Sequence, residues 1–389
     1  MILAGPPFAS DFFSDTVRRN GWPILDSEAA RSVGFGETDR LMPGTEAIRA
    51  LRKSDPPRVL TNTEDMYGWV TANLAGTAIA ETIGLLKDKA RFRQLMSPLY
   101  PGFWFEEVTF DTLEGLSADQ LRYPFVVKPD VGFLSIGVHD VMGPDDWQRT
   151  RAALKTEVDA ARAEYSSQVI DTGRFIFEQY LEGEEFAVDA YFDSDGRAVV
   201  LGVYRHPFSA ATSVVDRIYT TSMRIIQEHL GQMEGELGRI GQRAGIRDFP
   251  VHAEFRVDGD HRVVPVELNP LRFGGWCTTA DLAYHAWRLN EYELYFDDRA
   301  PDWDSVLRGR DGKQYSFVIL DKPDDIAAEQ VVGFDYDGLV SRLEHPLHLN
   351  RVDHRDHPLF GVVFIETSDD HPEEIEWILQ TDFSEFIKA

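Results

Sequence analysis

Three side chains with hard oxygen atoms, Glu254, Glu267 and Asn269, lie in the stretch from residue 249 to 275. This stretch is predicted to form two strands joined by a short turn at Asp258-Gly259-Asp260. With so short a turn, Glu254 and Glu267 fall opposite each other or nearly so, and facing like charges destabilise a β-ladder. A cation between them would remove the conflict, and two carboxylates with one amide oxygen suit Mg²⁺ completed by water and phosphates. The alternative is a solvated hairpin whose charged residues only face water.

Alternation of apolar and polar residues with a period of two predicts both strands. The first strand has apolar residues at 251, 253, 255 and 257, and between them His252, Glu254 and Arg256. On the return strand we expect Val264, Val266 and Leu268 on the apolar face, and Glu267 and Asn269 on the other. His252 and Arg256 share the face of Glu254 and are therefore candidates for contact with a substrate.

Composition excludes several classes of partner. The 389 residues include 39 Lys and Arg against 66 Asp and Glu, a formal net charge of −27 at pH 7. Nucleic acid or an anionic membrane is therefore not expected as the main partner, although a local positive pocket with a metal could still hold ATP. The single cysteine, Cys277, is expected to be a small packed residue. No apolar run is long enough to span a membrane, and without a signal-peptide pattern the chain is predicted to be cytoplasmic.

The two ends of the chain are each predicted to contain alternating strands and helices. Residues 1–84 have short apolar strand candidates at 1–4, 22–25 and 58–61, but no G-x-G-x-x-G dinucleotide fingerprint. Residues 301–389 have strand candidates at 314–320 and 361–366 and a helix at 371–379. Acidic and histidine residues are dense between these strands: Glu344, His345, His348, Asp353, His354, Asp356 and His357. Their spacing matches no defined metal site, and a solvated loop is the preferred interpretation.

A lysine and a glycine-rich turn follow each other near the middle of the chain. Residues 123–129, Tyr-Pro-Phe-Val-Val-Lys-Pro, are predicted to be a buried strand with Lys128 at its end, where an unpaired ammonium group would be costly. Gly132, Ser135 and Gly137 follow, and their backbone N–H groups and hydroxyl could cover a phosphate. No G-K-[ST] follows, so this is not a Walker A loop. Arg205, His206 and Arg217, in a stretch predicted to be irregular, are weaker candidates for a substrate pocket.

The order of these motifs resembles the ATP-grasp superfamily over roughly residues 85–280. The resemblance implies an α/β fold with α+β lobes that hold ATP between them. It implies a Rossmann-like N-terminal domain (1–84), a small lobe with a phosphate-covering loop (85–181), a large lobe with a metal site (182–300) and a C-terminal α/β extension (301–389).

The same resemblance assigns roles to individual residues. Lys89, with Lys87 less favoured, and Lys128 are implied to contact the phosphates, and Lys128 also to act in catalysis. Ser135 and Gly137 belong to the implied phosphate-covering loop. Glu178-Gln179-Tyr180-Leu181 corresponds to a hinge whose backbone contacts adenine, and Glu185 to the acid on the ribose. Glu254, Glu267 and Asn269 correspond to Mg²⁺ ligands, with Mn²⁺ as an alternative ion.

One departure concerns the residues after the metal strand. Members commonly have Asn-Pro-Arg or Asn-x-x-Pro-Gly, whereas this chain has Asn269-Pro-Leu-Arg272-Phe-Gly-Gly275, so Arg272 is displaced by one position. We expect Arg272 to be catalytic, facing the phosphate or the substrate carboxylate, where a guanidinium would stabilise an oxyanion. The alternative is that it only pairs with a surface acid.

The function that the resemblance implies is that of a Mg-ATP-dependent ligase. Such an enzyme activates a carboxylate as an acylphosphate and couples it to an amine, here an amino acid or small peptide. Two alternatives stay open: an ATP-grasp enzyme of kinase or carboxylase type, and a non-catalytic nucleotide-binding protein. The expected partners are small carboxylates and amines. The sequence does not fix the oligomeric state, for which a homodimer is the candidate.

Overall fold

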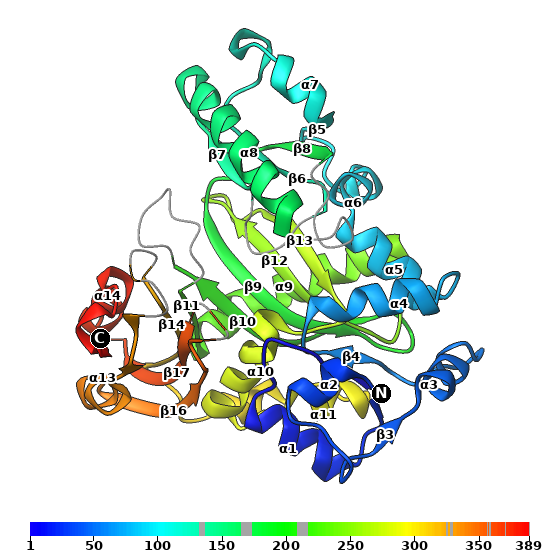
Figure 1. The fold of residues 1–389 in the computed structure, drawn as a ribbon, viewed down its shortest axis with the longest axis vertical. Helices are drawn as coiled ribbons and strands as arrows, with labels where there is room; N and C mark the ends of the chain where they lie inside the picture. Colours follow the sequence, from blue (N-terminus) through cyan, green and yellow to red (C-terminus); the bar gives the residue numbers. More distant parts are fainter. Residues whose placement is uncertain are drawn as a thin grey trace.

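A computed structural model describes residues 1–131, 137–164, 173–207, 217–323, 326, 330–355, 357, 359–369 and 371–388. The chain builds three main sheets (Figure 1). A parallel sheet lies at the N-terminus, a four-stranded antiparallel sheet forms an upper lobe, and an eight-stranded sheet lies between them and extends to the C-terminus.

The N-terminal sheet has the order β3-β2-β1-β4 and all its strands are parallel. Its strands are β1 (Ile2–Leu3), β2 (Ile24–Leu25), β3 (Leu41–Met42) and β4 (Leu60–Thr61), and its helices are α1 (Asp11–Asn20), α2 (Glu28–Ser32) and α3 (Gly44–Leu51). Three of the strands were predicted, and β3 was not. After β4 come η1 (Glu64–Met66), α4 (Tyr67–Asn73) and α5 (Ala78–Lys87). These short helices lead the chain towards the large sheet.

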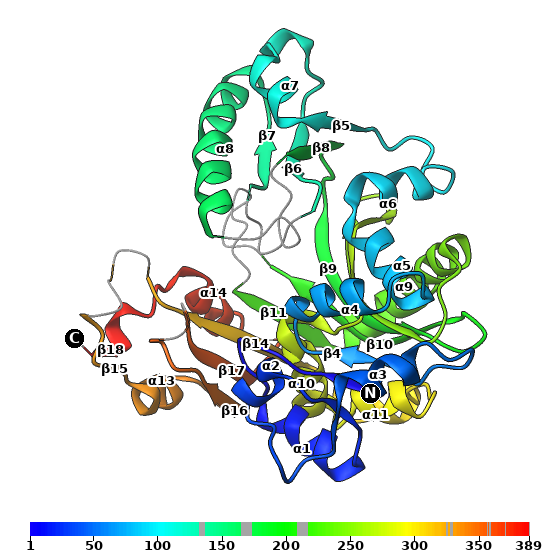
Figure 2. The same ribbon diagram turned by 45° about the vertical axis from the view of Figure 1, so that its right-hand side comes forward.

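The small lobe is built on the sheet β5-β8-β6-β7. It contains β5 (Phe105–Thr109), α7 (Phe110–Gly115), η2 (Ala118–Gln120), β6 (Phe125–Pro129), β7 (His139–Val141), α8 (Pro144–Glu164) and β8 (Arg174–Gln179). A separate cluster of buried side chains, including Phe125, Trp147 and Phe177, holds the lobe together. Figures 1 and 2 show this lobe projecting from the large sheet. The strand predicted at 123–129 is confirmed as β6, with Lys128 near its end.

The large sheet has the order β13-β12-β9-β10-β11-β14-β17-β16, with every pair antiparallel. Its strands are β9 (Glu184–Phe192), β10 (Ala198–His206), β11 (Ile218–Ser222), β12 (Phe249–Val257), β13 (Val263–Pro270), β14 (Lys313–Asp321), β16 (His345–Arg351) and β17 (Leu359–Ser368). The strands after residue 300 therefore continue the sheet that carries the hairpin. The prediction of an irregular 205–221 stretch was wrong at both ends, where β10 and β11 pair with each other.

The long helix α9 (Met223–Ala244) packs against this sheet, as the two views indicate. It begins where the Ser222 hydroxyl accepts from the Ile225 N–H and ends at Gly245, which has a left-handed φ of 69°. Its buried face includes Ile226, Met233 and Leu237. Gly241 is required at the contact with the sheet, because a Cβ there would lie 2.1 Å from the Phe192 ring. The helix thereby covers the apolar face of the sheet on which Phe192 lies, opposite the face that carries Glu254 and Glu267.

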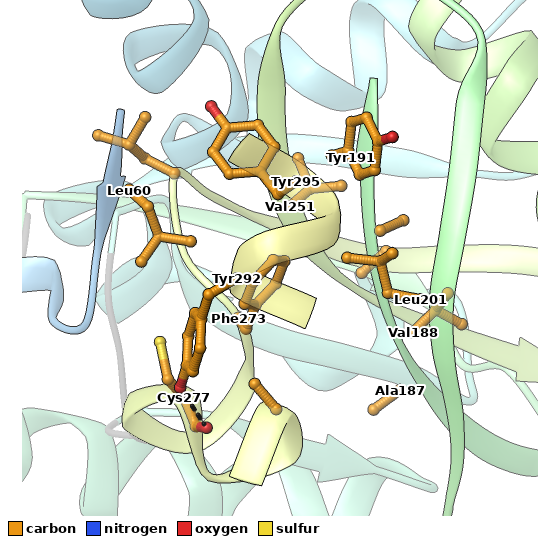
Figure 3. Close-up of a cluster of buried hydrophobic side chains, with 14 of the residues drawn as sticks. Leu60, Ala187, Val188, Tyr191, Leu201, Val251, Phe273, Cys277, Tyr292 and Tyr295 are labelled. Carbon is orange, nitrogen blue, oxygen red and sulfur yellow. Dashed lines mark hydrogen bonds between the residues drawn. The ribbon is translucent and has the colours of Figure 1, made fainter. Parts of the chain in front are cut away.

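The remaining helices join the large sheet to the N-terminal sheet and to the C-terminus. They are α10 (Gly274–Trp287), α11 (Glu291–Phe296), α12 (Trp303–Val306), α13 (Tyr336–Arg342) and α14 (Glu373–Gln380), followed by η4 (Ser384–Phe386) and the small pair β15 (Gly333–Phe334) and β18 (Ile387–Lys388). Figure 3 shows Phe273, Cys277 and Tyr292 in the core cluster between these parts. Burial raises the pKa of the Cys277 thiol, as expected for a packed residue. In the described part of the chain, no helix is long and apolar enough to cross a membrane.

Candidate active site

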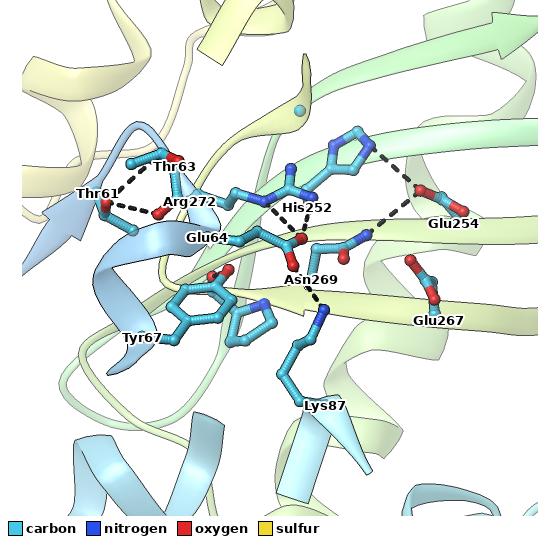
Figure 4. Close-up of polar contacts among 12 residues, drawn as sticks. Thr61, Thr63, Glu64, Tyr67, Lys87, His252, Glu254, Glu267, Asn269 and Arg272 are labelled. Carbon is cyan, nitrogen blue, oxygen red and sulfur yellow. Dashed lines mark hydrogen bonds and ion pairs between the residues drawn. The ribbon is translucent and has the colours of Figure 1, made fainter. Parts of the chain in front are cut away.

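The predicted hairpin forms and brings its acidic residues together. Glu254 on β12 is the direct partner of Glu267 on β13, and His252 is the partner of Asn269. All four side chains therefore lie on one face of the sheet. Figure 4 shows them projecting from the two strands beside Arg272. The prediction that Glu254 and Glu267 face each other across the ladder is confirmed.

A β-bulge in β13 places Val264 on the opposite face from the one predicted. The register passes from Glu254↔Glu267 to Phe255↔Pro265, so Val266 is an extra residue. Val264 consequently pairs with Arg256 and lies on the polar face, and the apolar face is completed by Val263, Pro265 and Leu268. The prediction for Val264 was wrong because alternation alone cannot reveal an inserted residue.

Polar partners already compensate both carboxylates. Lys89 Nζ lies 3.2 Å from Glu267 Oε2, and Asn269 Nδ2 donates to Glu254 Oε1 at 3.3 Å. Burial opposes ionisation of Glu267, but the nearby lysines outweigh it and hold its pKa well below the usual range. Among the described residues, no three His, Cys, Asp or Glu side chains are gathered as a ready metal cluster. The donors nevertheless fit Mg²⁺, because two carboxylates and an amide share one face and the Lys89 ammonium already binds one of these carboxylates.

Lys128 is held by a buried ion-pair cluster. Its Nζ lies 2.7 Å from Glu178 Oε2, and Arg93 Nε lies 2.6 Å from Glu178 Oε1. Burial raises the pKa of Glu178, but Arg93 and Lys128 outweigh this and bring it to about 2. Burial lowers the pKa of Lys128, and Glu178 offsets this only in part. The Glu178 side chain thus positions the lysine, a role beyond the backbone contact that the hinge motif implied.

The helix α6 (Lys89–Met96) carries Lys89 and links it to Lys128. Asp88 separates α5 from α6, and its side chain caps α6 by accepting from the Arg91 N–H. Asp130, two residues after Lys128, accepts from the Ala90 N–H at 2.7 Å with Oδ1. At the other end, Arg93 donates to the carbonyls of Pro265 and Val266, the bulged part of β13. One short helix therefore ties both lysines to the hairpin.

Arg272 pairs with an acid that comes from the N-terminal part of the chain. Its Nη2 lies 2.7 Å from Glu64 Oε1, and Lys87 Nζ lies 2.6 Å from Glu64 Oε2. Burial works against the charge on Arg272, but Glu64 outweighs it and raises the pKa of the guanidinium. The residue before it, Leu271, has a left-handed φ of 61°. Figure 4 shows the contact between Arg272 and Glu64.

Glu64 and Arg93 were not predicted from the sequence as site residues. Arg93 lies four residues after Lys89 on the same helix, and this spacing could have placed it beside the lysine. Glu64 gives no local signal, because its partner Arg272 is 208 residues away.

A cavity of about 1120 Å³ lies at the hinge between the lobes. Its lining includes Gln179, Tyr180, Leu181, Arg256 and Val264, together with aromatic residues such as Trp104 and Tyr123. It does not include Lys128, Glu254 or Glu267. The cavity and the carboxylate face meet at Arg256, whose Nη2 lies 2.8 Å from Glu185 Oε2. Such an aromatic-lined space beside a charged face suits a nucleoside next to its phosphates.

Comparison with known families bears directly on this arrangement. Residues 121–280 match the model described as "ATP-grasp domain", and this range contains Lys128, the hinge and the whole hairpin. The chain contains an ATP-grasp domain. The predicted resemblance and fold class are confirmed. No curated protein sequence matched the chain significantly.

Solved structures share the ATP-grasp fold over nearly the full length. An L-amino acid ligase from Bacillus licheniformis is 15% identical, with a TM-score of 0.68, 100% of this chain and 97% of that chain covered. N5-carboxyaminoimidazole ribonucleotide synthetase from Thermotoga maritima is 13% identical, with a TM-score of 0.64 and coverage of 100% and 98%. Biotin carboxylase from Campylobacter jejuni is 12% identical, with a TM-score of 0.61 and coverage of 91% and 84%. At these identities the likeness concerns the fold.

The remaining predicted residues make contacts away from Glu254 and Glu267. His206 contacts Glu185, with Nδ1 3.1 Å from Oε1, beside Arg256. Arg205 lies 3.6 Å from Glu184. Arg217 turns towards the C-terminus, where it donates to the carbonyl of Thr381 and stacks on Phe383. Gly137 is described, with a φ of 73°. Ser135 and the rest of the predicted loop at 132–136 lie outside the described residues.

Proposed function

We propose that the protein is a Mg-ATP-dependent ligase that activates a carboxylate as an acylphosphate and couples it to an amine. The observation that carries this proposal is that Glu254 and Glu267 face each other on the hairpin with Lys89 3.2 Å from Glu267, while Lys128 of the adjoining small lobe and the hairpin lie within the ATP-grasp domain. A protein that only binds nucleotide needs no such set, whereas phosphoryl transfer needs charge neutralised along the whole phosphate path.

Each group has a physical role in this proposal. Lys89 and Lys128 contact phosphate oxygens, and a lysine suits a moving phosphoryl group because its charge imposes no planar geometry. Glu254, Glu267 and the Asn269 amide oxygen would hold Mg²⁺, which would supply neutralisation of phosphate charge. Lys89, which pairs with Glu267 at 3.2 Å, would then be available to contact phosphate. Arg272, fixed by Glu64, stabilises the oxyanion of the acyl group.

Two steps complete the proposed reaction. A carboxylate oxygen of the substrate attacks the γ-phosphorus, the bond to the β-phosphate oxygen breaks, and ADP leaves. The amine nitrogen then attacks the acyl carbon, the bond to the phosphate oxygen breaks, and the amine loses a proton as phosphate departs. Because an acylphosphate hydrolyses readily, the gap between the lobes must exclude water during both steps.

A coupled assay for ADP and phosphate tests the proposal. The full chain is supplied with ATP, Mg²⁺ and pairs drawn from a panel of amino acids and small peptides. We expect ADP and phosphate to form in equal amounts with an amide product for at least one pair, and the Glu267→Gln variant to show no turnover. ATP binding without product for every pair would contradict the proposal.

A carboxylase-type reaction is the second candidate, favoured by the fold shared with a biotin carboxylase and with N5-carboxyaminoimidazole ribonucleotide synthetase. There the carboxylate that receives the phosphoryl group would be bicarbonate. An ¹⁸O label separates the two candidates, since the ligase moves label from an organic carboxylate into phosphate. Label arriving only from bicarbonate would favour the carboxylase.

A further inference from the structure

A chain of buried polar residues runs from the core to the carboxylate face, and the proposed mechanism does not use it. It begins at Asp189 on β9, whose side chain is fully buried. Asp189 Oδ1 lies 2.7 Å from His252 Nδ1 and also accepts from the Gly274 N–H at 3.0 Å. His252 is itself 3% exposed. The pair therefore fixes an imidazole on the same face as Glu254.

The hydrogen bond to Asp189 determines which imidazole nitrogen faces the site. An ionised carboxylate can only accept, so His252 Nδ1 carries a proton and donates it to Asp189. On the neutral ring, Nε2 then presents a lone pair. That atom lies 3.8 Å from Glu254 Oε1, an oxygen that is also an acceptor. Two acceptors directed towards each other are suited by a cation between them.

Glu291 behind Asp189 strengthens this arrangement. Asp189 Oδ2 and Glu291 Oε2 are both buried, and the two carboxyl groups interact with each other. Burial and the neighbouring Asp189 carboxylate raise the pKa of Glu291. Tyr204 fixes Glu291 by donating to Oε1 at 3.0 Å. Tyr204, Glu291 and Asp189 thus hold the His252 imidazole in one tautomer.

The sheet register completes a four-cornered set of donors. His252 and Asn269 are cross-strand partners, as are Glu254 and Glu267, and such pairs have Cβ atoms about 5 Å apart. Along each strand the two members of one face are roughly 7 Å apart. The ring of His252 is also confined, because a Cβ on Gly274 would lie 2.3 Å from it. A carboxylate bound to the far nitrogen is the usual support of a metal-ligating histidine.

We propose that His252 supplies Nε2 as a nitrogen ligand to the divalent cation of this site, beside Glu254, Glu267 and Asn269. This rests on the proposed function, which places a cation there. An imidazole ligand favours first-row transition ions over Mg²⁺, so the site binds Mn²⁺ or Co²⁺ more tightly than an all-oxygen site would. Glu267 must leave Lys89 for the set to close around the ion.

Pulsed electron paramagnetic resonance of Mn²⁺ bound to the full chain with ADP tests the assignment. We expect modulation from a directly bound ¹⁴N nucleus. Because adenine also contains nitrogen, protein labelled with ¹⁵N-histidine is compared with unlabelled protein, and the label should replace the ¹⁴N signal. His252→Gln should remove the signal and weaken Mn²⁺ binding at least 10-fold, whereas His285→Gln, at a partly buried histidine on α10, should change neither.

The positioning role of Asp189 is tested in the same experiment. Asp189→Asn should weaken Mn²⁺ binding about 10- to 100-fold, the range found for residues that orient a metal ligand. Unchanged Mn²⁺ affinity in Asp189→Asn would show that Asp189 does not position His252. Mn²⁺ bound without a histidine nitrogen, or with one that persists in His252→Gln, would overturn the assignment of His252 and leave the ligase proposal standing. Failure of Mn²⁺ to bind with ADP would overturn both. The labelled wild-type protein gives a decision even if the variants do not fold.

Discussion

The β12–β13 hairpin and strand β16 lie at opposite edges of the large sheet and both carry acidic or histidine residues at high density, but we propose a site only for the hairpin. On β12 and β13 these side chains pair with each other across the ladder at one edge of the sheet, below the small lobe. Strand β16 is the last strand of the same sheet and pairs with β17 alone. His345 and His348 there are exposed, and His348 contacts Asn350 and stacks on His285.

The difference teaches that residue type alone does not predict chemistry. On the hairpin, register sets Glu254 against Glu267, and helix α6 brings Lys89 to the same place. Near β16, the acids are neutralised by short-range partners, as Asp353 is by Arg355 two residues on. A local ion pair of this kind is worth little and leaves no charge for a ligand.

The largest predicted effect is the loss of ATP turnover when a carboxylate of the hairpin is removed. Glu267→Gln removes one of the two facing carboxylates, so the proposed metal loses a charged ligand. We expect turnover of ATP to fall at least about 1000-fold, since a bound metal contributes several kcal/mol to a phosphoryl transition state. The ADP assay measures the loss. Glu344→Gln, next to β16, is the matched control and should keep wild-type activity; equal losses would remove the distinction between the two regions.

The next effect concerns stability and compares the buried cluster around Glu178 with an exposed ion pair near the C-terminus. Glu178→Gln leaves Arg93 and Lys128 buried without their counter-charge, and we expect the free energy of unfolding to fall by about 3–5 kcal/mol. Glu385→Gln breaks the exposed pair with Arg342, in which both side chains are 50% exposed, and should cost less than about 1 kcal/mol. Urea unfolding at pH 7 compares the two variants. A similar small loss in both would show that the cluster around Lys128 does not support the fold.

Arg272→Lys sharpens the role of the arginine next to the hairpin. The charge beside Glu64 is kept, but the planar guanidinium that binds an oxyanion through two donors is lost. We expect kcat/KM for the carboxylate to fall about 100-fold, with the KM for ATP changed much less. Steady-state kinetics with each substrate varied in turn measure kcat/KM for the carboxylate and KM for ATP. A rise confined to the KM for ATP would place Arg272 at the nucleotide instead.

The dependence of stability on pH tests the buried cluster by a smaller effect. The pKa of Glu178 is about 2 in the folded protein, below its ordinary value of 4.5. Its contribution is therefore complete above about pH 4.5 and is lost as the pH falls towards 2. The free energy of unfolding of the wild-type protein should therefore fall as the pH is lowered across this window. The Glu178→Gln variant should show a smaller slope of this free energy against pH. An unchanged slope would mean that Glu178 is not held ionised by Arg93 and Lys128.

The smallest effect is expected on β16. His348→Gln removes an exposed ring, and we expect stability to change by less than about 0.5 kcal/mol with activity unaltered. Thermal unfolding and the ADP assay are sufficient to check this. A marked loss of metal-dependent activity would reverse the comparison and assign chemistry to the edge strand.

Much of the site could be predicted because its signals are local. Period-two alternation was enough to place Glu254 opposite Glu267, and a lysine at the end of a buried strand pointed to Lys128. The face of Val264 could not be predicted, since a bulge depends on how two strands pair. Glu64 and Arg93 were missed because their partners, Arg272 and Glu178, are 208 and 85 residues away. Long-range partners depend on the packing of whole elements, which the local pattern does not contain.

Anomalous diffraction from a crystal of the full chain soaked with Mn²⁺ and ADP tests the central claim most directly. The hairpin face is claimed to be the metal and phosphate site of the ATP-grasp domain. We predict one anomalous peak or two between Glu254 and Glu267, with the ADP phosphates reaching Lys89 and Lys128. A peak along β16 with none at the hairpin, or ADP bound without metal near these carboxylates, would contradict the claim.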